Sequence, residues 1–218
     1  YQFSKQYGVR YVLNGTNIAT EGASSPFSTQ LSCMDSWHLR SVYHKCGRGK
    51  SLKKYQMLSL VQARWKFSAI EQVNLLNHIP YSKKEAIATL ECEYGWEYYG
   101  GKHFESRFTK WFQSAYLPRK FGYDKRRYHL SCLINNGEMT RDEALSELAR
   151  PPYDPEQMRE DEAYILKKLD ITQAEWNKVM AQPPTPNDAY FSQEKLIRFA
   201  EKLLGKKRTA AIKQQKSV

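Results

Sequence analysis

Three pairs of residues constrain the fold of this chain most, because each pair marks the place where a helix begins. The pairs are Ser82 with Glu85, Thr140 with Glu143, and Thr172 with Glu175. In such a capping box the two side chains satisfy backbone N–H groups that the first turn of a helix leaves free. Together with the spacing of apolar residues, the pairs predict helices over 59–76, 82–93, 103–115, 140–149, 156–169, 172–181 and 192–204.

The first 22 residues predict a different arrangement. Residues 1–7 have a helical pattern that Gly8 ends, and a short strand over 9–13 follows. Helix, strand and polar loop in this order are typical of an α/β sheet whose ligands gather at the carboxyl ends of the strands. A lone strand cannot form a sheet, so we expect its partners upstream of Tyr1. The β signals then fade, and 23–55 reads as a long loop with short helical turns.

Charge and composition limit the class of partner. The net charge of +11, from 34 basic and 23 acidic residues, predicts an anionic partner: nucleic acid, acidic lipid, nucleotide phosphates or an acidic sugar. No apolar run reaches the roughly 18 residues of a membrane helix, which argues against a membrane span. The four cysteines form no CxxC pair, so reduced thiols in a cytoplasmic protein are the simplest interpretation, with a Cys/His zinc site as the alternative.

Three segments carry candidate ligand-binding residues. The first is the loop after the predicted strand, whose small residues allow close approach of a ligand and whose polar side chains can bind it. Its candidates are Asn14, Gly15, Thr16, Asn17 and Glu21. A polar surface turn is the alternative interpretation.

The second segment is a glycine turn placed immediately before a predicted helix. It contains Gly100, Gly101, Lys102 and His103, and Glu105 is expected in the first helical turn. Backbone N–H groups and a lysine at a helix start attract phosphate or carboxylate. A plain connecting loop would have the same sequence.

The third segment, 117–131, concentrates cations around one carboxylate. Its candidates for chemistry are Lys120, Asp124, Lys125, Arg126, Arg127 and His129. Lysine and arginine can hold a polyphosphate and offset the charge that develops as it leaves, while the aspartate orients a cation or binds a magnesium-bridged phosphate. A solvated basic helix face and a nucleic-acid surface with interleaved aromatic residues remain alternatives.

These segments resemble the N-acetyl sugar amidotransferase family of bacterial surface-polysaccharide and nonulosonic-acid biosynthesis. The resemblance runs through NGTNIATEG, GWEYYGGKHFESRFTKWFQ and LPRKFGYDKRRYHLSCLINNGEMTRDEALSEL, and it covers about residues 5–181. It implies a Rossmann-like PP-loop fold, related to adenine nucleotide alpha hydrolases, of which this chain is the mostly helical C-terminal part with a short β remnant. The implied regions are 1–55, the end of the nucleotide-binding domain; 56–186, a helical substrate-side region; and 187–218, a helix and basic tail.

The resemblance also implies a reaction and its participants. ATP, with Mg²⁺, would activate the amide oxygen of an N-acetyl group on a nucleotide-linked sugar, and ammonia from a glutaminase partner would convert that group to an acetamidino group. Such sugars belong to lipopolysaccharide O-antigens or flagellin glycans. The loop that grips pyrophosphate in this family is missing from the sequence, so we expect it upstream of Tyr1 and expect residues 1–218 alone to lack ATP pyrophosphatase activity.

By this resemblance the loop residues from Asn14 to Glu21 would line the nucleotide or substrate site, and those from Gly100 to Glu105 would touch the sugar or pyrophosphate. The four cations of the third segment would stabilise leaving phosphate charge, with Asp124 orienting them and His129 carrying a proton. One alternative function is an RNA-binding or tRNA-modifying PP-loop module, which no RNP-like or cysteine-rich RNA motif supports. The other is a non-catalytic interaction domain that docks a glutaminase.

Overall fold

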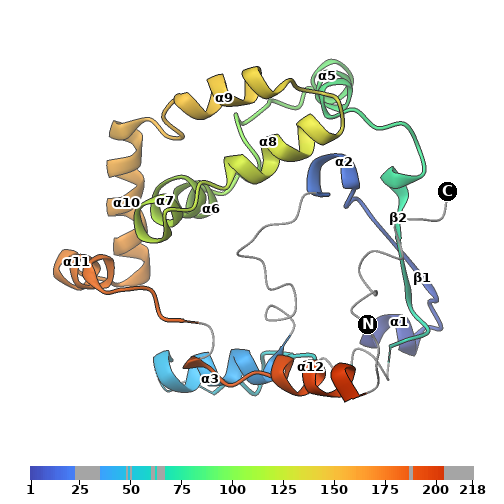
Figure 1. The fold of residues 1–218 in the computed structure, drawn as a ribbon, viewed down its shortest axis with the longest axis vertical. Helices are drawn as coiled ribbons and strands as arrows, with labels where there is room; N and C mark the ends of the chain where they lie inside the picture. The colour runs from blue at the N-terminus through green and yellow to red at the C-terminus, as the bar shows by residue number, and fades with distance from the viewer. Residues whose placement is uncertain are drawn as a thin grey trace. The chain divides into compact units, whose positions relative to one another are not determined.

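The computed structural model describes residues 1–22, 35–47, 49, 51–59, 62, 67–186 and 189–203. Most of these residues are helical (Figure 1). The elements before residue 80 are α1 Gln2–Gln6, β1 Tyr11–Asn14, α2 Ile18–Glu21, α3 Ser36–Cys46, β2 Glu71–Asn74 and the short 3-10 helix η2 Leu75–Asn77. The later ones are α5 Lys83–Tyr94, α6 Arg107–Trp111, η3 Phe112–Tyr116, α7 Leu117–Phe121, α8 Arg126–Asn135, α9 Arg141–Ala149, α10 Pro155–Leu169, α11 Gln173–Ala181 and α12 Glu194–Leu203.

The chain divides into two compact units. Unit 1 comprises Tyr1–Val12, Phe27–Glu71 and Thr185–Val218, and unit 2 comprises Leu13–Pro26 and Gln72–Pro184. The region boundaries expected at residues 55 and 186, like the Rossmann-like fold, stay predictions.

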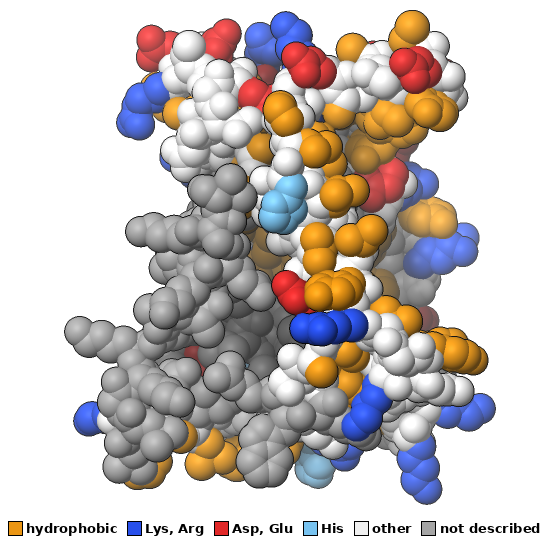
Figure 2. Space-filling model, turned by 90° about the vertical axis from the view of Figure 1, so that its right-hand side faces the viewer, with side chains coloured by type: hydrophobic (Ala, Val, Ile, Leu, Met, Phe, Trp, Pro, Cys, Tyr) orange, Lys and Arg blue, Asp and Glu red, His pale blue; other side chains and the backbone are white. Residues whose placement is uncertain are grey.

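Strands β1 and β2 form a two-stranded parallel sheet. The N–H of Glu71 donates to the carbonyl of Arg10 at 2.7 Å near the start of the pairing. The helix predicted over 59–76 is therefore wrong at 71–74, where pairing with β1 overrides the local pattern. Strand β1 itself confirms the strand predicted over 9–13, and α1 with Gly8 at φ +66° confirms the glycine-stopped helix before it. Tyr11 and Leu13 of β1 are exposed, and hydrophobic side chains are visible at the surface in Figure 2.

The hydrophobic core of unit 2 is built around two tryptophans. Trp111 of α6 and Trp176 of α11 are both buried, with ring centroids 5.4 Å apart. Ala115, Tyr153 and, from α10, Ile165 and Leu166 complete the buried cluster. Both indole N–H groups donate to Glu162, at 3.2 Å from Trp111 and 3.1 Å from Trp176. One carboxylate thus fixes the two largest core side chains relative to each other.

The capping signals are confirmed. Thr140 and Thr172 each form a complete capping box with the glutamate three residues later, at the starts of α9 and α11. Ser82 caps α5 by accepting from the N–H of Glu85. The helices predicted over 82–93, 140–149, 156–169, 172–181 and 192–204 are present within two residues of those bounds.

Two of the sequence-based boundaries are wrong. The helix predicted over 103–115 begins only at Arg107, because Ser106 is its N-cap, and it continues through a π-helical turn, Phe112–Tyr116, into α7. The interval 23–55 is not a long loop throughout, because 11 of its residues form α3. The start of α3 is set by Asp35, whose carboxylate accepts from the N–H groups of Trp37 and His38. Residues 23–34 lie outside the described residues.

Candidate anion-binding site

Three lysines and a histidine from separate segments of unit 2 influence one another electrostatically. Lys83 lies in the first turn of α5, Lys102 in the loop before α6, and Lys125 at the N-cap of α8. We call these three residues the lysine cluster. Their positive charges all disfavour protonation of His129 in α8 and so lower its pKa. Segments far apart in sequence thus concentrate positive charge at one place.

Glu21, the last residue of α2, positions one member of the cluster. Its Oε1 lies 2.6 Å from the Nζ of Lys102. The hydroxyl of Tyr128 donates to the backbone carbonyl of Glu21 at 2.7 Å, and α2 packs against α8. The end of α2 is therefore fixed on α8, and the ion pair holds Lys102 there.

A second carboxylate organises the start of α5. The Oε2 of Glu138 accepts from the N–H of Lys83 at 2.9 Å and from the hydroxyl of Ser82 at 3.4 Å. The amide of Asn136 donates to the other carboxylate oxygen at 2.7 Å. A carboxylate at a helix N-terminus is favourable, whereas a lysine side chain there is not. Glu138 thus fixes the backbone that carries Lys83.

The lysines are held in an environment that opposes their own charge. Burial, and then the charge of Lys102, lowers the pKa of both Lys83 and Lys125. Glu138 opposes this for Lys83 and Glu21 opposes it for Lys125, in each case more weakly than burial. Crowded cations with a partial counter-charge are stabilised when a multivalent anion binds among them. This arrangement therefore suits a phosphate or carboxylate ligand.

His129 lies beside the lysine cluster with its polar atoms unused. Within the part of the chain that the structure describes, neither of its buried ring nitrogens has a hydrogen-bond partner. Burial, followed by the charges of Lys102, Lys125, Lys83 and His103, lowers the pKa of His129 to about 3. The imidazole is therefore neutral at pH 7 and offers one donor and one acceptor. An unsatisfied buried polar group is costly, so a ligand that pairs with it would be stabilised.

The polar side chains of the predicted loop after β1 mainly form hydrogen bonds within the fold. Asn17 is the N-cap of α2 and accepts from the N–H of Thr20 at 2.8 Å. Thr16 donates to Asn74 at the end of β2, at 3.0 Å, and also to Asn14. Gly15 has open space around its Cα. Of the predicted loop residues, Glu21 alone has a side chain paired with the lysine cluster in the described structure.

The predicted glycine turn is confirmed as a turn, but the position expected for Glu105 is wrong. Gly100 has φ +82°, and a Cβ on Gly101 would come within 2.7 Å of the Phe104 ring, so both positions require glycine. Glu105 precedes the N-cap Ser106 instead of lying in the first helical turn. Its carboxylate lies 3.5 Å from the ring of the exposed His103. This turn therefore positions Lys102, whose backbone carbonyl accepts a hydrogen bond from the buried Gln113 at 3.4 Å.

Three of the predicted catalytic cations are placed differently from Lys125. The Nζ of Lys120 donates to the carbonyls of Val179 and Gln182 at the end of α11. Arg126 forms an ion pair with Asp124 at 2.8 Å and donates to the carbonyls of Glu147 and Arg150 at the end of α9. Arg127 is exposed.

Through these contacts Lys120 binds the end of α11 and Arg126 binds the end of α9, and Asp124 orients Arg126. A direct role of Lys120, Asp124, Arg126 and Arg127 in chemistry stays a prediction. Sequence reasoning missed Lys83, Tyr128 and Glu138. The available signal was Lys83-Lys84 in the first turn of a capped helix, where acidic residues are the favourable choice.

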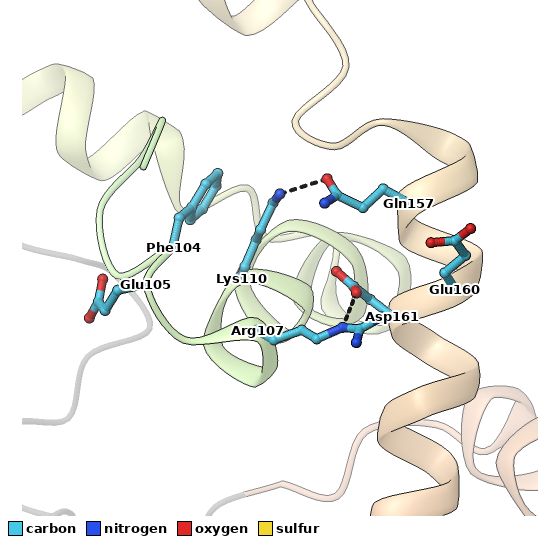
Figure 3. A pocket seen from close by; sticks show the side chains of 7 residues that line it. All are labelled: Phe104, Glu105, Arg107, Lys110, Gln157, Glu160 and Asp161. Carbon is cyan, nitrogen blue, oxygen red and sulfur yellow. Dashed lines mark hydrogen bonds and ion pairs between the residues drawn. The ribbon is translucent and has the colours of Figure 1, made fainter. Parts of the chain in front are cut away.

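A pocket of about 310 Å³ lies between α10 and the segment that contains α6 and the residues just before it (Figure 3). It is lined by Phe104, Glu105, Arg107, Lys110, Gln157, Glu160 and Asp161. Arg107 forms an ion pair with the buried Asp161, and Lys110 donates to Gln157 at 2.8 Å (Figure 3). Both cations of this pocket thus have partners among its lining residues, so we do not assign it a ligand.

Over the described ranges, no three His, Cys, Asp or Glu side chains gather as a metal site would require. Cys46 and Cys92 are free thiols, and Cys33 lies outside the described residues. Among the helices that the structure describes, none combines the length and apolar character needed to cross a membrane.

Part of the chain is similar to a known protein family. Residues 105–204 match the family described as LPS biosynthesis protein WbpG-like, C-terminal domain. The matched range contains Lys125, Tyr128, His129 and Glu138, whereas Glu21, Lys83 and Lys102 precede it. The match supports a WbpG-like family with a role in lipopolysaccharide biosynthesis. Comparison with curated proteins and with solved structures gave no match.

Proposed function

We propose that this chain is the substrate-side part of an ATP-dependent amidotransferase of lipopolysaccharide biosynthesis. It would act on the N-acetyl group of a nucleotide-linked sugar, with ammonia from a glutaminase partner. The sequence resemblance supports the reaction, and the WbpG-like match supports the biosynthetic role. The observation that carries the proposal is the lysine cluster together with His129, whose buried ring nitrogens have no hydrogen-bond partner among the described residues. Together these residues provide a site for the anionic groups that such a substrate, or ATP, would bring.

The lysine cluster would bind phosphate by charge. Lysine offers a compact ammonium with three donors, which suits a phosphate oxygen approached from several directions. Glu21 would keep Lys102 in place while leaving donors free, because one carboxylate oxygen occupies one of them. A bound phosphate would offset the mutual repulsion of the three lysines and would resist the loss of their protons.

His129 would change its protonation when an anion binds. Without a ligand, burial and three lysines lower its pKa to about 3. A phosphate beside the ring adds negative charge and accepts a hydrogen bond, and both effects favour the imidazolium. The proposal therefore gives His129 the role of a proton acceptor that becomes more basic when substrate is present.

ATP and magnesium belong to the proposal through the sequence resemblance. The lysine cluster fits the phosphates of ATP as well as those of a nucleotide-linked sugar, and ATP would supply activation of the amide oxygen. The described residues contain no group of three metal-ligating side chains, so no step is assigned to Mg²⁺. The residues of this chain would bind the anion, orient it through the Glu21–Lys102 pair, and accept a proton at His129.

The test is an assay of the full-length gene product with ATP, ammonium and a nucleotide-linked N-acetyl sugar. Mass spectrometry should detect a product in which NH replaces the amide oxygen. The variants Lys102→Met and Lys125→Met should lower turnover by about a hundredfold, the scale for losing one charge-stabilising donor. Lys84→Met is the matched control, because Lys84 is exposed on α5 next to Lys83.

Absence of the product from the wild-type reaction would contradict the amidotransferase assignment. Wild-type turnover in both cluster variants would contradict the role of the lysines. Tight, strongly salt-dependent binding of tRNA would favour the alternative RNA function instead.

A further inference from the structure

Unit 1 contains a cavity of about 460 Å³ that the proposed function does not use. It is lined by Trp37, Arg40, Ser41, His44 and Lys45 of α3 and by Phe191. The lining therefore combines two large aromatic rings with two cations and a histidine. None of these described lining residues is acidic.

The two aromatic rings stack on each other and leave part of their surface exposed. The rings of Trp37 and Phe191 are stacked, with centroids 5.5 Å apart and planes 15° apart. The two side chains nevertheless remain 39% and 67% exposed. Exposed aromatic surface is unfavourable in water, and a flat apolar ligand that covers it would recover that free energy.

Hydrogen bonds hold the backbone segments that carry the two rings. Asp35 is fully buried, and its Oδ1 accepts from the N–H of Trp37 at 2.9 Å. Its Oδ2 accepts from the hydroxyl of Ser192 at 2.8 Å and from the N–H of Gln193 at 2.6 Å. The N–H of Phe191 donates to the hydroxyl of Ser41 at 2.9 Å. Because both rings are held before any ligand arrives, binding would lose little conformational entropy.

The cations are arranged beside the rings. Arg40 and His44 follow Trp37 at three and seven positions, which places them on the same face of α3. The Nζ of Lys45 donates to the carbonyl of Ala189 at 2.6 Å, which holds the ammonium next to the segment that carries Phe191. An anionic group on a ligand that stacks on the rings would therefore find complementary charge.

We propose that this cavity binds a free nucleotide, with the base stacked on Trp37 and Phe191 and the phosphate held by Arg40, Lys45 and His44. An uncharged apolar ligand would not use the cations, and inorganic phosphate would not use the rings. Stacking tolerates every base, because each has a π face, so the site selects nucleotides as a class. This inference does not depend on the proposed amidotransferase activity.

The test is calorimetric titration of residues 1–218 with AMP, adenosine and ribose 5-phosphate. AMP should bind at least about tenfold more tightly than the other two, because adenosine lacks the phosphate and ribose 5-phosphate lacks the base. Phe191→Ala should weaken AMP binding about tenfold or more. Arg40→Gln should weaken it and reduce its dependence on salt.

Phe199→Ala is the matched control, because Phe199 is also exposed, on α12, and does not line the cavity. Trp37→Phe keeps an aromatic ring and should retain most of the affinity, whereas Trp37→Leu should not. Circular dichroism would verify that each variant is folded.

Three outcomes would overturn the proposal. They are no AMP binding at about 5 mM, equal AMP affinity in wild type and the Phe191→Ala variant, or binding of a single-stranded oligoribonucleotide without binding of AMP.

Discussion

The Nζ of Lys102 lies 2.6 Å from the Oε1 of Glu21, so an ion pair joins the loop before α6 to the end of α2 across 81 positions of sequence. Both side chains are partly buried, and Glu21 is in turn fixed by the hydroxyl of Tyr128. The pair sets where the ammonium of Lys102 lies relative to Lys125 and His129. It is the contact that turns separate basic segments into one candidate site.

Neighbouring lysines on α5 should differ sharply in their effect on anion binding. Lys83→Met should weaken binding of inorganic pyrophosphate to residues 1–218 by about tenfold, because it removes one charged donor from the lysine cluster. Lys84→Met removes the same charge one position away, from an exposed side chain, and should have little effect. Isothermal titration calorimetry measures both. Equal losses would mean that net charge alone governs binding.

Stability should fall as the pH falls below about 6.5, through His129. Its folded pKa is lowered to about 3, so between these values the unfolded state binds more protons than the folded state. Folding stability is then intact above the unfolded pKa and decreases as the pH falls toward the folded one. Allowing for solvent screening, His129 should contribute about 1 kcal/mol to the loss between pH 7 and pH 5.

Urea unfolding at these two pH values checks this expectation. His129→Gln should reduce the loss of stability on acidification, because the glutamine has no proton to gain. His78→Gln, at an exposed histidine, is the matched control. A variant at His129 with the full wild-type pH dependence would show that this imidazole is not the group responsible.

Lys120 should matter for stability through α11. Its ammonium donates to backbone carbonyls at the C-terminal end of that helix, where a cation is favourable. Lys120→Ala should lower the free energy of unfolding by about 1 kcal/mol. Arg127→Ala, at an exposed cation in the same basic segment, should have a smaller effect. Thermal unfolding compares the two variants, and equal Tm values would argue against a capping role.

Glu162 should be the most sensitive charged residue of the core region. It accepts from both buried indoles and pairs with Arg119 at 2.6 Å. Glu162→Gln should lower the free energy of unfolding by about 2 kcal/mol, because the amide can replace only part of this acceptor set. Glu160→Gln, at an exposed glutamate two positions away, is the control. Denaturant unfolding in which both variants match wild type would contradict this role.

Local signals predicted the helices well. The hydroxyl and carboxylate of each capping box lie three residues apart, so Thr140 and Thr172 could be recognised without any knowledge of tertiary structure. Strand β2 could not be recognised in this way, because its pairing with β1 is a long-range contact that the sequence Glu-Gln-Val-Asn does not indicate. The start of α6 was misplaced because His103 and Glu105 fit a helical pattern, whereas Ser106 caps the helix.

The candidate site was predicted in part. Glu21, Lys102, Lys125 and His129 were chosen from three separate segments, and the structure brings them together. Their neighbours Lys120 and Arg126 have the same side-chain chemistry but bind helix ends instead. Composition cannot tell a cation of the candidate site from one that binds a helix end. The packing of α8, α9 and α11 decides which carbonyls or cations lie near each side chain. Lys83 was missed for the same reason.

The most direct test of the lysine cluster is the pKa of His129 with and without an anion. Imidazole resonances assigned with His129→Gln would be followed by NMR as a function of pH, in residues 1–218 alone and with saturating inorganic pyrophosphate. The account predicts a pKa near 3 without the anion and a clear rise when pyrophosphate is bound. An unchanged pKa in the presence of bound pyrophosphate would contradict the claim that this site binds anions.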